Sequence, residues 1–132
     1  MKRSIELTKD PIDEGLMVSS RTLSHQMGAV VYFSGIVREG EQGRKIDAIV
    51  YEAFEEMAVH QFKLIFDEVE QKWPIESIRL IHRIGHVPVN ESSLWVEVTS
   101  PHRQEAFQAC EWLIVEMKKR VPIWKHPQFV GN

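Results

Sequence analysis

The sequence predicts an α+β fold in which a mostly antiparallel sheet is covered by helices. Short runs rich in β-branched and aromatic residues alternate with two long stretches of helical periodicity. The segments follow in the order β-α-β-β-α-β-β-α with an extended tail, and this order contains two hairpins. The chain of 132 residues is 43% hydrophobic, which suffices to bury one core without a metal or a disulfide. We therefore expect residues 1–132 to form a single domain.

The first part of the chain predicts three strands and a short helix. Residues 4–7 alternate as a short strand does, and residues 11–23 predict a helix opened by a proline. Residues 29–38 are rich in β-branched and aromatic side chains, so they predict a buried strand. The polar, glycine-bearing residues 39–45 predict a loop. Residues 46–54 follow as a strand that we expect to form a hairpin with the strand before the loop.

The second part predicts two long helices around another hairpin. Residues 55–73 carry apolar side chains three or four residues apart, and Pro74 ends this helix. Residues 78–84 and 94–99 predict a pair of strands, and a last helix begins after Ser100. The inward faces of the two helices are expected to be Ala58, Phe62, Ile65, Phe66, Val69 and Trp73 in the first, and Ala106, Phe107, Cys110, Leu113, Ile114 and Met117 in the second.

Composition argues against several classes of protein. A formal net charge of -3 disfavours general binding to nucleic acid. No window approaches the roughly 18 apolar residues of a membrane span, so we expect a soluble cytoplasmic protein that contacts no membrane. The single cysteine, Cys110, cannot form an internal disulfide and is expected in the core rather than as a nucleophile. The six histidines lack metal-ligand spacing, and we expect neither a metal nor a cofactor.

Charge is segregated along the chain. Residues 51–70 contain six acids and one base, whereas residues 117–126 contain four bases and no acid. The acidic run is typical of a solvated helix face. The basic run is consistent either with a solvated surface or with a cationic pocket for a small anion.

The start of the last helix is a candidate anion site. Ser100 is a preferred N-cap and Pro101 a preferred first helical residue, so we expect the helix to begin here. His102 and Arg103 would then occupy the first turn, where the helix dipole favours anions. Free backbone amides, an imidazole and a guanidinium together suit a phosphate or carboxylate. The alternative is that both side chains simply face solvent.

Further candidate residues lie elsewhere in the chain. The cations at 118–120 suit the end of a helix and need no function to explain them. Lys125 is placed by the apolar segment that follows Pro122, and an amine held beside an aromatic wall suits nucleophilic or proton-transfer chemistry. Spacing does not show whether Lys118 or Lys119 faces the same way. Arg38 ends a buried strand just before a loop, a common place for a ligand contact.

Four motifs in this order resemble the large, catalytic subunit of molybdopterin synthase. They span residues 28–38, 81–85, 98–103 and 118–125, and the similarity covers about residues 28 to 126. The resemblance implies a fold of the α/β-hammerhead type. It also implies a cytoplasmic sulfurtransferase of molybdenum cofactor biosynthesis, which converts cyclic pyranopterin monophosphate to molybdopterin.

The same resemblance implies partners and a pocket. The subunit would form a homodimer, and two small ubiquitin-like sulfur carriers would bind at its opposite ends, giving a heterotetramer. Each carrier would deliver sulfur as a thiocarboxylate on its C-terminal Gly-Gly tail. The family's substrate-binding residues fall on Arg38, His102, Arg103, Lys118 and Lys125. Lys118 and Lys125 would also be the catalytic residues.

Two departures and one alternative accompany this interpretation. The chain ends at Asn132, where many relatives continue, and residues 126–128 leave Lys125 without an acidic neighbour in sequence. Reduced activity or a different carrier interface would follow from either. The alternative function is a non-catalytic α+β module, which would bind a phosphorylated small molecule at the Ser100 helix start and regulate a partner.

Overall fold

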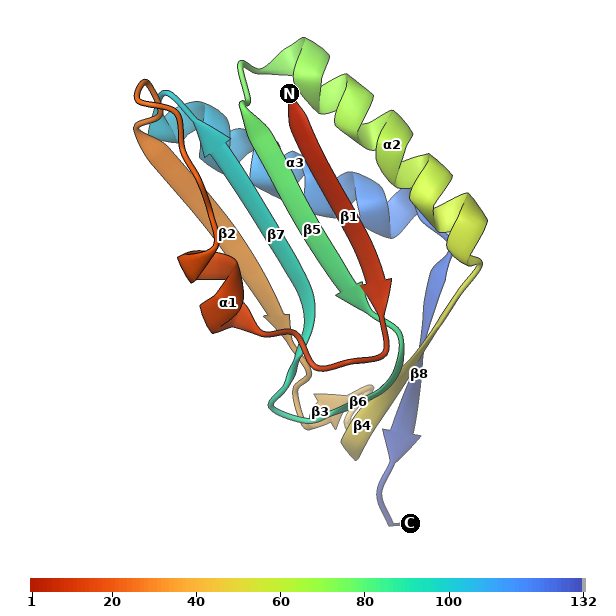
Figure 1. Ribbon diagram of the computed structural model, residues 1–132. Helices are drawn as coiled ribbons and strands as arrows, with labels where there is room; N and C mark the ends of the chain where they lie inside the picture. Colours follow the sequence, from red (N-terminus) through yellow and green to blue (C-terminus); the bar gives the residue numbers. More distant parts are fainter. Residues whose placement is uncertain (132) are drawn as a thin grey trace.

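A computed structural model describes residues 1–131, and Asn132, the last residue of the predicted domain, lies outside the described residues. The elements in chain order are β1 (Lys2–Thr8), α1 (Glu14–Ser19), β2 (Ala29–Ile36), β3 (Gly40–Glu41), β4 (Arg44–Ala53), α2 (Glu55–Lys72), β5 (Ser77–Arg83), β6 (Gly85–Pro88), β7 (Ser92–Ser100), α3 (Arg103–Arg120) and β8 (Ile123–Phe129). Figure 1 shows that the strands form two sheets, with the smaller one extending from one end of the larger.

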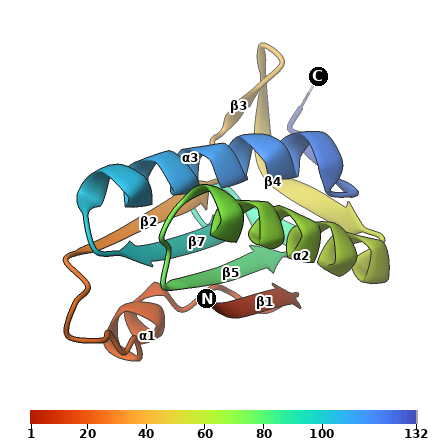
Figure 2. The same ribbon diagram turned by 90° about the horizontal axis from the view of Figure 1, so that it is seen from above.

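The larger sheet has the strand order β1-β5-β7-β2. β1 runs parallel to β5, and the other neighbours are antiparallel. The two long helices, α2 and α3, cover one face, while α1 lies on the opposite side (Figure 2). The main core lies between the sheet and the two long helices, and its fully buried members include Phe62, Phe66, Leu80, Val96 and Leu113. Burying large apolar side chains between these two layers is the main driving force for this architecture.

The smaller sheet has the strand order β3-β4-β6, and β8 also pairs with β4. β4 pairs antiparallel with both β6 and β8, so Tyr51 lies between Gly85 and Lys125. A small apolar cluster of Val37, Ile46, Ile49 and Val87 supports this sheet. The tail predicted as extended is therefore a strand, and it brings Lys125 into the second sheet.

The α+β class, the mostly antiparallel pairing and the helix cover are confirmed. α2 buries Ala58, Phe62, Ile65, Phe66 and Val69 as its periodicity predicts, whereas Trp73, predicted on the same face, follows the helix end and is half-buried. The antiparallel pairing of β5 with β7 is confirmed as well. These features depend on local periodicity and on strands that are close in sequence, which a single sequence reveals well.

The predicted hairpin between residues 29–38 and 46–54 is wrong. β2 pairs with β7, and β4 lies in the other sheet. Residues 39–45 are not a loop but a tight hairpin of β3 and β4, in which Gln42 and Gly43 both have positive φ, 54° and 73°. Such a two-residue turn folds the chain directly back on itself. The strand that follows it therefore pairs with β3 and leaves the edge of β2 uncovered.

The first helix is shorter than the predicted range 11–23. α1 begins after Asp13, whose side chain accepts a hydrogen bond from the Leu16 amide at 3.0 Å, and it ends at Ser19. Arg79 donates to the carbonyl of Met17, in the last turn of the helix. Side-chain capture of a terminal carbonyl favours the end of a helix at that point. None of the helices within residues 1–131 combines the length and apolar character needed to cross a membrane.

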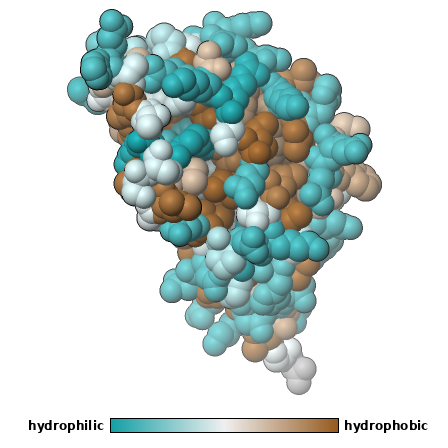
Figure 3. All heavy atoms as spheres, viewed as in Figure 1, coloured by the Kyte–Doolittle hydropathy of each residue, from teal (hydrophilic) through white to brown (hydrophobic). Residues whose placement is uncertain are grey.

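The predicted inner face of the last helix is partly wrong. Phe107 is 59% exposed, and Ala109 is buried in its place. The buried residues of α3 follow the spacing of Ala106, Ala109, Leu113 and Met117, and the position after Ala106 lies about 100° around the helix. Hydrophobic side chains also show on the face of the larger sheet that is turned to the viewer in Figure 3, with hydrophilic residues around them.

Candidate functional site

The predicted site residues fall into groups at the two ends of α3. His102 precedes the helix and Arg103 is its first residue, whereas Lys118 lies in its last turn. Fifteen residues separate Arg103 from Lys118, which corresponds to about 22 Å along the helix axis. One chain therefore does not bring the five predicted residues together around one small molecule.

The start of α3 differs from the prediction in its capping. Ser100 is the last residue of β7 and is fully buried, and its hydroxyl donates to the His102 carbonyl at 2.5 Å. His102 is the N-cap, and its side chain makes no capping hydrogen bond. The helix begins after His102, because Ser100 pairs with Ala29 in the sheet and its hydroxyl bonds to the His102 carbonyl. Its first amides consequently have no side-chain cap and remain available to an anion.

Gly28 lies against this turn and fixes its position. The Gly28 amide donates to the Ser100 carbonyl at 3.2 Å. A Cβ atom on Gly28 would lie 2.5 Å from the Pro101 carbonyl oxygen, so only glycine allows this approach. A hollow at this point is lined by Gly28, Pro101, His102, Arg103 and Gln104. The side chains of His102 and Arg103 are exposed at its rim.

At the other end of α3, the three consecutive cations differ in their partners. Lys119 lies 3.4 Å from a Glu116 oxygen, and Arg120 contacts both Glu116 at 3.5 Å and Glu68 at 2.6 Å. Among residues 1–131, Lys118 has no carboxylate within ion-pair distance, and it is exposed. Lys119 and Arg120 serve ion pairs on the surface, and Lys118 is the cation available to a ligand.

Lys125 lies beside two residues that the sequence did not single out. Its Nζ atom is 3.9 Å from the Glu41 carboxylate, and its neighbour on β4 is Tyr51. The Tyr51 hydroxyl donates to the Ser93 hydroxyl at 3.3 Å, and its ring meets the edge of His82. Burial raises the pKa of Tyr51, and the negative charge of Glu41 adds to this rise. Sequence reasoning missed both residues because only the pairing of β8 with β4 and the β3–β4 hairpin brings them to Lys125.

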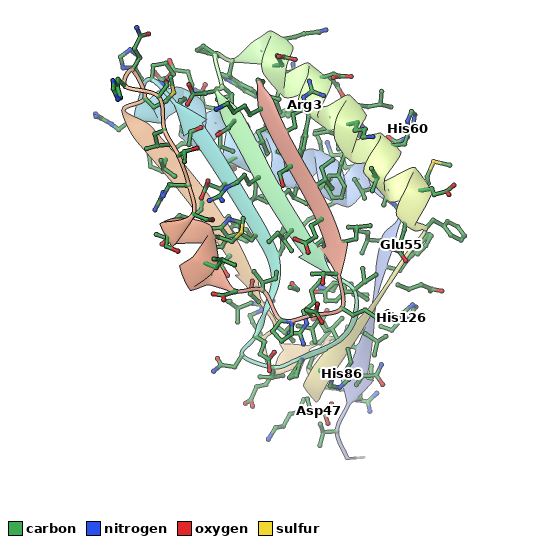
Figure 4. All side chains as sticks on the ribbon, viewed as in Figure 1. Arg3, Asp47, Glu55, His60, His86 and His126 are labelled. Carbon is green, nitrogen blue, oxygen red and sulfur yellow. The ribbon has the colours of Figure 1, made fainter. Side chains whose placement is uncertain are left out.

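Arg38 lies between the end of β2 and the β3–β4 hairpin. The residue before it, Val37, is buried, and its amide and carbonyl bond to Glu91 and Asn90 at 3.0 and 2.8 Å. Arg38 itself is exposed, three residues before Glu41. Its backbone is thus anchored to the start of β7 while its side chain is free. Figure 4 shows that His126, next to Lys125 in sequence, lies on the second sheet with His86.

A metal has no evident place in this arrangement. No group of three or more potential metal ligands occurs among the residues that the structure describes. The available chemistry is that of cations and amides, which suits a phosphate and a carboxylate or thiocarboxylate.

Cys110 is buried on the inner face of α3, as the sequence predicts. Burial raises the pKa of its thiol to about 11. We expect no reaction with a disulfide reagent at about pH 8 in the native protein, because the thiolate is the reactive species. One thiol per chain should react after unfolding in guanidinium chloride. Rapid reaction of the native protein would contradict the assignment of Cys110 to the core.

Fold and site together define an α+β protein with exposed basic side chains at both ends of one helix and on an added strand. The family model described as MoaE protein matches residues 7–120. The chain belongs to this family.

Curated relatives and solved structures agree with this membership. The molybdopterin synthase catalytic subunit of Pyrococcus abyssi is 40% identical over 128 residues, covering 94% of this chain and 84% of that protein. The subunit of the same name from Bacillus subtilis is 38% identical over 120 residues, covering 91% and 76%. These names are those of enzymes, and they do not favour the alternative of a non-catalytic regulatory module.

The crystal structure of molybdopterin synthase from Staphylococcus aureus matches with a TM-score of 0.87 and 35% identity, covering 96% of this chain and 92% of that one. A complex of subunits 1 and 2 of molybdopterin-converting factor from Helicobacter pylori has a TM-score of 0.72 at 19% identity, over 98% of this chain and 86% of that one. The second match shows a shared fold. The first supports the predicted fold type directly.

Proposed function

We propose that this chain is the catalytic subunit of a molybdopterin synthase. It transfers sulfur from the thiocarboxylated Gly-Gly tail of a small carrier subunit to cyclic pyranopterin monophosphate. Family membership supports the reaction class. The observation on this chain that carries the proposal is the placement of exposed basic side chains, His102 and Arg103 at one end of α3 and Lys118 at the other.

The residues divide the task according to their chemistry. Arg103, His102 and the uncapped amides hold the substrate phosphate, and Arg38 contacts the pterin or phosphate end. When the carrier's acyl carbon gives up its sulfur and takes an oxygen from water, negative charge develops on the carbonyl oxygen. Lys118 and Lys125 stabilise this charge, donate a proton or form a transient covalent link.

A second copy of the chain completes this site. About 22 Å along α3 separates the phosphate-binding residues, His102 and Arg103, from Lys118 in one chain. The phosphate-binding residues of one chain must therefore meet the lysines of another. An antiparallel approach of two α3 helices does this. Phe107 lies four residues after Arg103, and Val115 lies three residues before Lys118. Contact between Phe107 of one copy and Val115 of the other therefore brings Arg103 beside Lys118.

Exposed apolar side chains support such a dimer. Phe107 and Val115 are 59% and 43% exposed on the outer face of α3. Tyr32, Phe33 and Ile36 are exposed on β2, the edge strand of the larger sheet. Unpaired edges and apolar patches are common sites of association. Two carriers bind at opposite ends of such a dimer, giving a heterotetramer. The cytoplasmic location remains a prediction.

Reconstitution tests the proposed function. The purified chain is mixed with cyclic pyranopterin monophosphate and a thiocarboxylated carrier, and molybdopterin is followed by the fluorescence of its oxidised derivative. We expect product only with the thiocarboxylated carrier and none with the same carrier ending in an ordinary carboxylate. Binding of the substrate without any sulfur transfer would instead support the regulatory module.

A further inference from the structure

The residues next to Lys125 in sequence offer no counter-charge, but the fold supplies one. Glu41 reaches Lys125 from the β3–β4 hairpin, with 3.9 Å between its carboxylate and the Nζ atom. The Glu41 side chain is 22% exposed, and that of Lys125 is 54% exposed. Within residues 1–131, no other carboxylate lies within ion-pair distance of Lys125.

The hairpin that carries Glu41 is short and is closed by a tight turn. Its two turn residues, Gln42 and Gly43, both have positive φ, the geometry of a tight type I′ turn. Glu41 pairs with Arg44 across the turn, and the Ile46 amide donates to the Glu39 carbonyl at 2.7 Å just before it. The turn and the pairing with β4 therefore define the backbone position of Glu41.

Both flanking residues of the turn contact one face of β8. The Arg44 guanidinium lies over the Phe129 ring, 4.1 Å from its centre, while Glu41 reaches Lys125. Lys125 and Phe129 are four residues apart on one strand, so their side chains share a face. The Val130 amide also donates to the Lys45 carbonyl at 2.9 Å. The hairpin is thus attached to β8 at several points, and Glu41 has a defined position relative to Lys125.

We propose that Glu41 is a positioning residue for Lys125, holding its ammonium group over the space beside Tyr51 where the carrier tail reacts. This inference rests on the proposed function, since it assigns a purpose to the direction in which Lys125 points. A lysine has four flexible side-chain bonds, and an unrestrained ammonium samples many positions. A distance of 3.9 Å is too long for a hydrogen bond, so Lys125 keeps its donors for the substrate.

The ion pair of Glu41 with Lys125 contributes little to the stability of the fold. An ion pair this exposed adds little to stability, so the fold does not require it. The charge of Glu41 nevertheless acts on a neighbouring side chain, because it contributes to the raised pKa of Tyr51. A role in orienting Lys125 accounts for a carboxylate that the fold can do without.

Glu41→Gln tests the inference, since it removes the charge and keeps the shape. We expect kcat for molybdopterin formation to fall about 10- to 100-fold, because small misplacements of reacting groups have effects of this size. KM for the carrier should not rise. Glu41→Asp, whose carboxylate is withdrawn by one methylene, should fall between the wild type and Glu41→Gln. The control is Glu39→Gln, which should retain wild-type kcat. Glu39 is an exposed acid two residues before Glu41.

A second measurement does not depend on catalysis. Carbon-13 relaxation of the lysine ε-methylene groups reports how ordered each side chain is, and Lys125 should become more mobile in Glu41→Gln but not in Glu39→Gln. Unchanged mobility would overturn the inference, as would increased mobility with wild-type kcat. If the wild-type chain forms no molybdopterin, the proposed function fails, while the relaxation data still decide whether Glu41 orders Lys125.

Discussion

Lys118→Ala is expected to lower molybdopterin formation by about 100- to 1000-fold, the usual effect of removing a charge that stabilises a transition state. The side chain is exposed in the last turn of α3 and has no carboxylate partner among residues 1–131. Its truncation should therefore change the free energy of unfolding by no more than about 0.5 kcal/mol. Initial rates of product fluorescence and chemical denaturation measure the two quantities.

The next residue provides a matched control. Lys119 has the same chemistry and the same helix, but it pairs with Glu116. Lys119→Ala should retain nearly full activity and lose at most about 1 kcal/mol of stability, as is typical of an exposed ion pair. Near-normal turnover in Lys118→Ala would remove Lys118 from the chemistry. Equal losses in both variants would mean that general positive charge matters, rather than one placed ammonium.

Mixing two inactive variants is expected to restore activity. Arg103→Ala and Lys118→Ala each damage both sites of a homodimer. If each site takes Arg103 from one chain and Lys118 from the other, a mixed dimer has one site with both changes and one intact site. Each mixed dimer should therefore have about half of wild-type activity, and an unseparated random assortment, about half of which is mixed dimer, should have about one quarter. The variants are co-expressed with different tags, and the mixed dimer is isolated for assay.

The control for this experiment combines Lys118→Ala with Lys125→Ala. Each site takes both Lys118 and Lys125 from the same chain. Every site of the mixed dimer therefore lacks one of the two lysines, and no activity should return. A failure of Arg103→Ala and Lys118→Ala to complement each other, in a dimer shown to be mixed, would contradict the two-chain site. A loss of carrier binding in Arg103→Ala with unchanged substrate affinity would show that Arg103 contacts the carrier instead.

Much of the fold follows from local patterns. The apolar spacing of α2 predicts its buried face correctly, and Pro74 follows the helix end. The hairpin of β5 and β7 follows from two apolar runs with turn residues between them. The partner of β2 could not be predicted, because pairing with β7 joins residues more than 50 positions apart. Periodicity describes one segment at a time and contains no information about such pairs.

The candidate site shows the same division. Motif resemblance identified Arg38, His102, Arg103, Lys118 and Lys125 by residue type and order. It did not place them in space, where α3 separates the phosphate-binding pair from Lys118. The prediction starts α3 two residues too early, because Ser100 and Pro101 are a good capping pair in sequence. In the structure Ser100 is instead the last residue of β7, and strand pairing decides this.

The sequence by itself determined the α+β class, the two amphipathic helices, the buried cysteine and the residue types of an anion site. These are properties of short segments, set by side-chain periodicity and backbone preference. Only the tertiary structure decided which lysine has no ion-pair partner within residues 1–131, that Glu41 is the acid beside Lys125, and that α3 separates Arg103 from Lys118. Those facts depend on strand pairing and on the length of a helix between two groups, which are relations between distant parts of the chain.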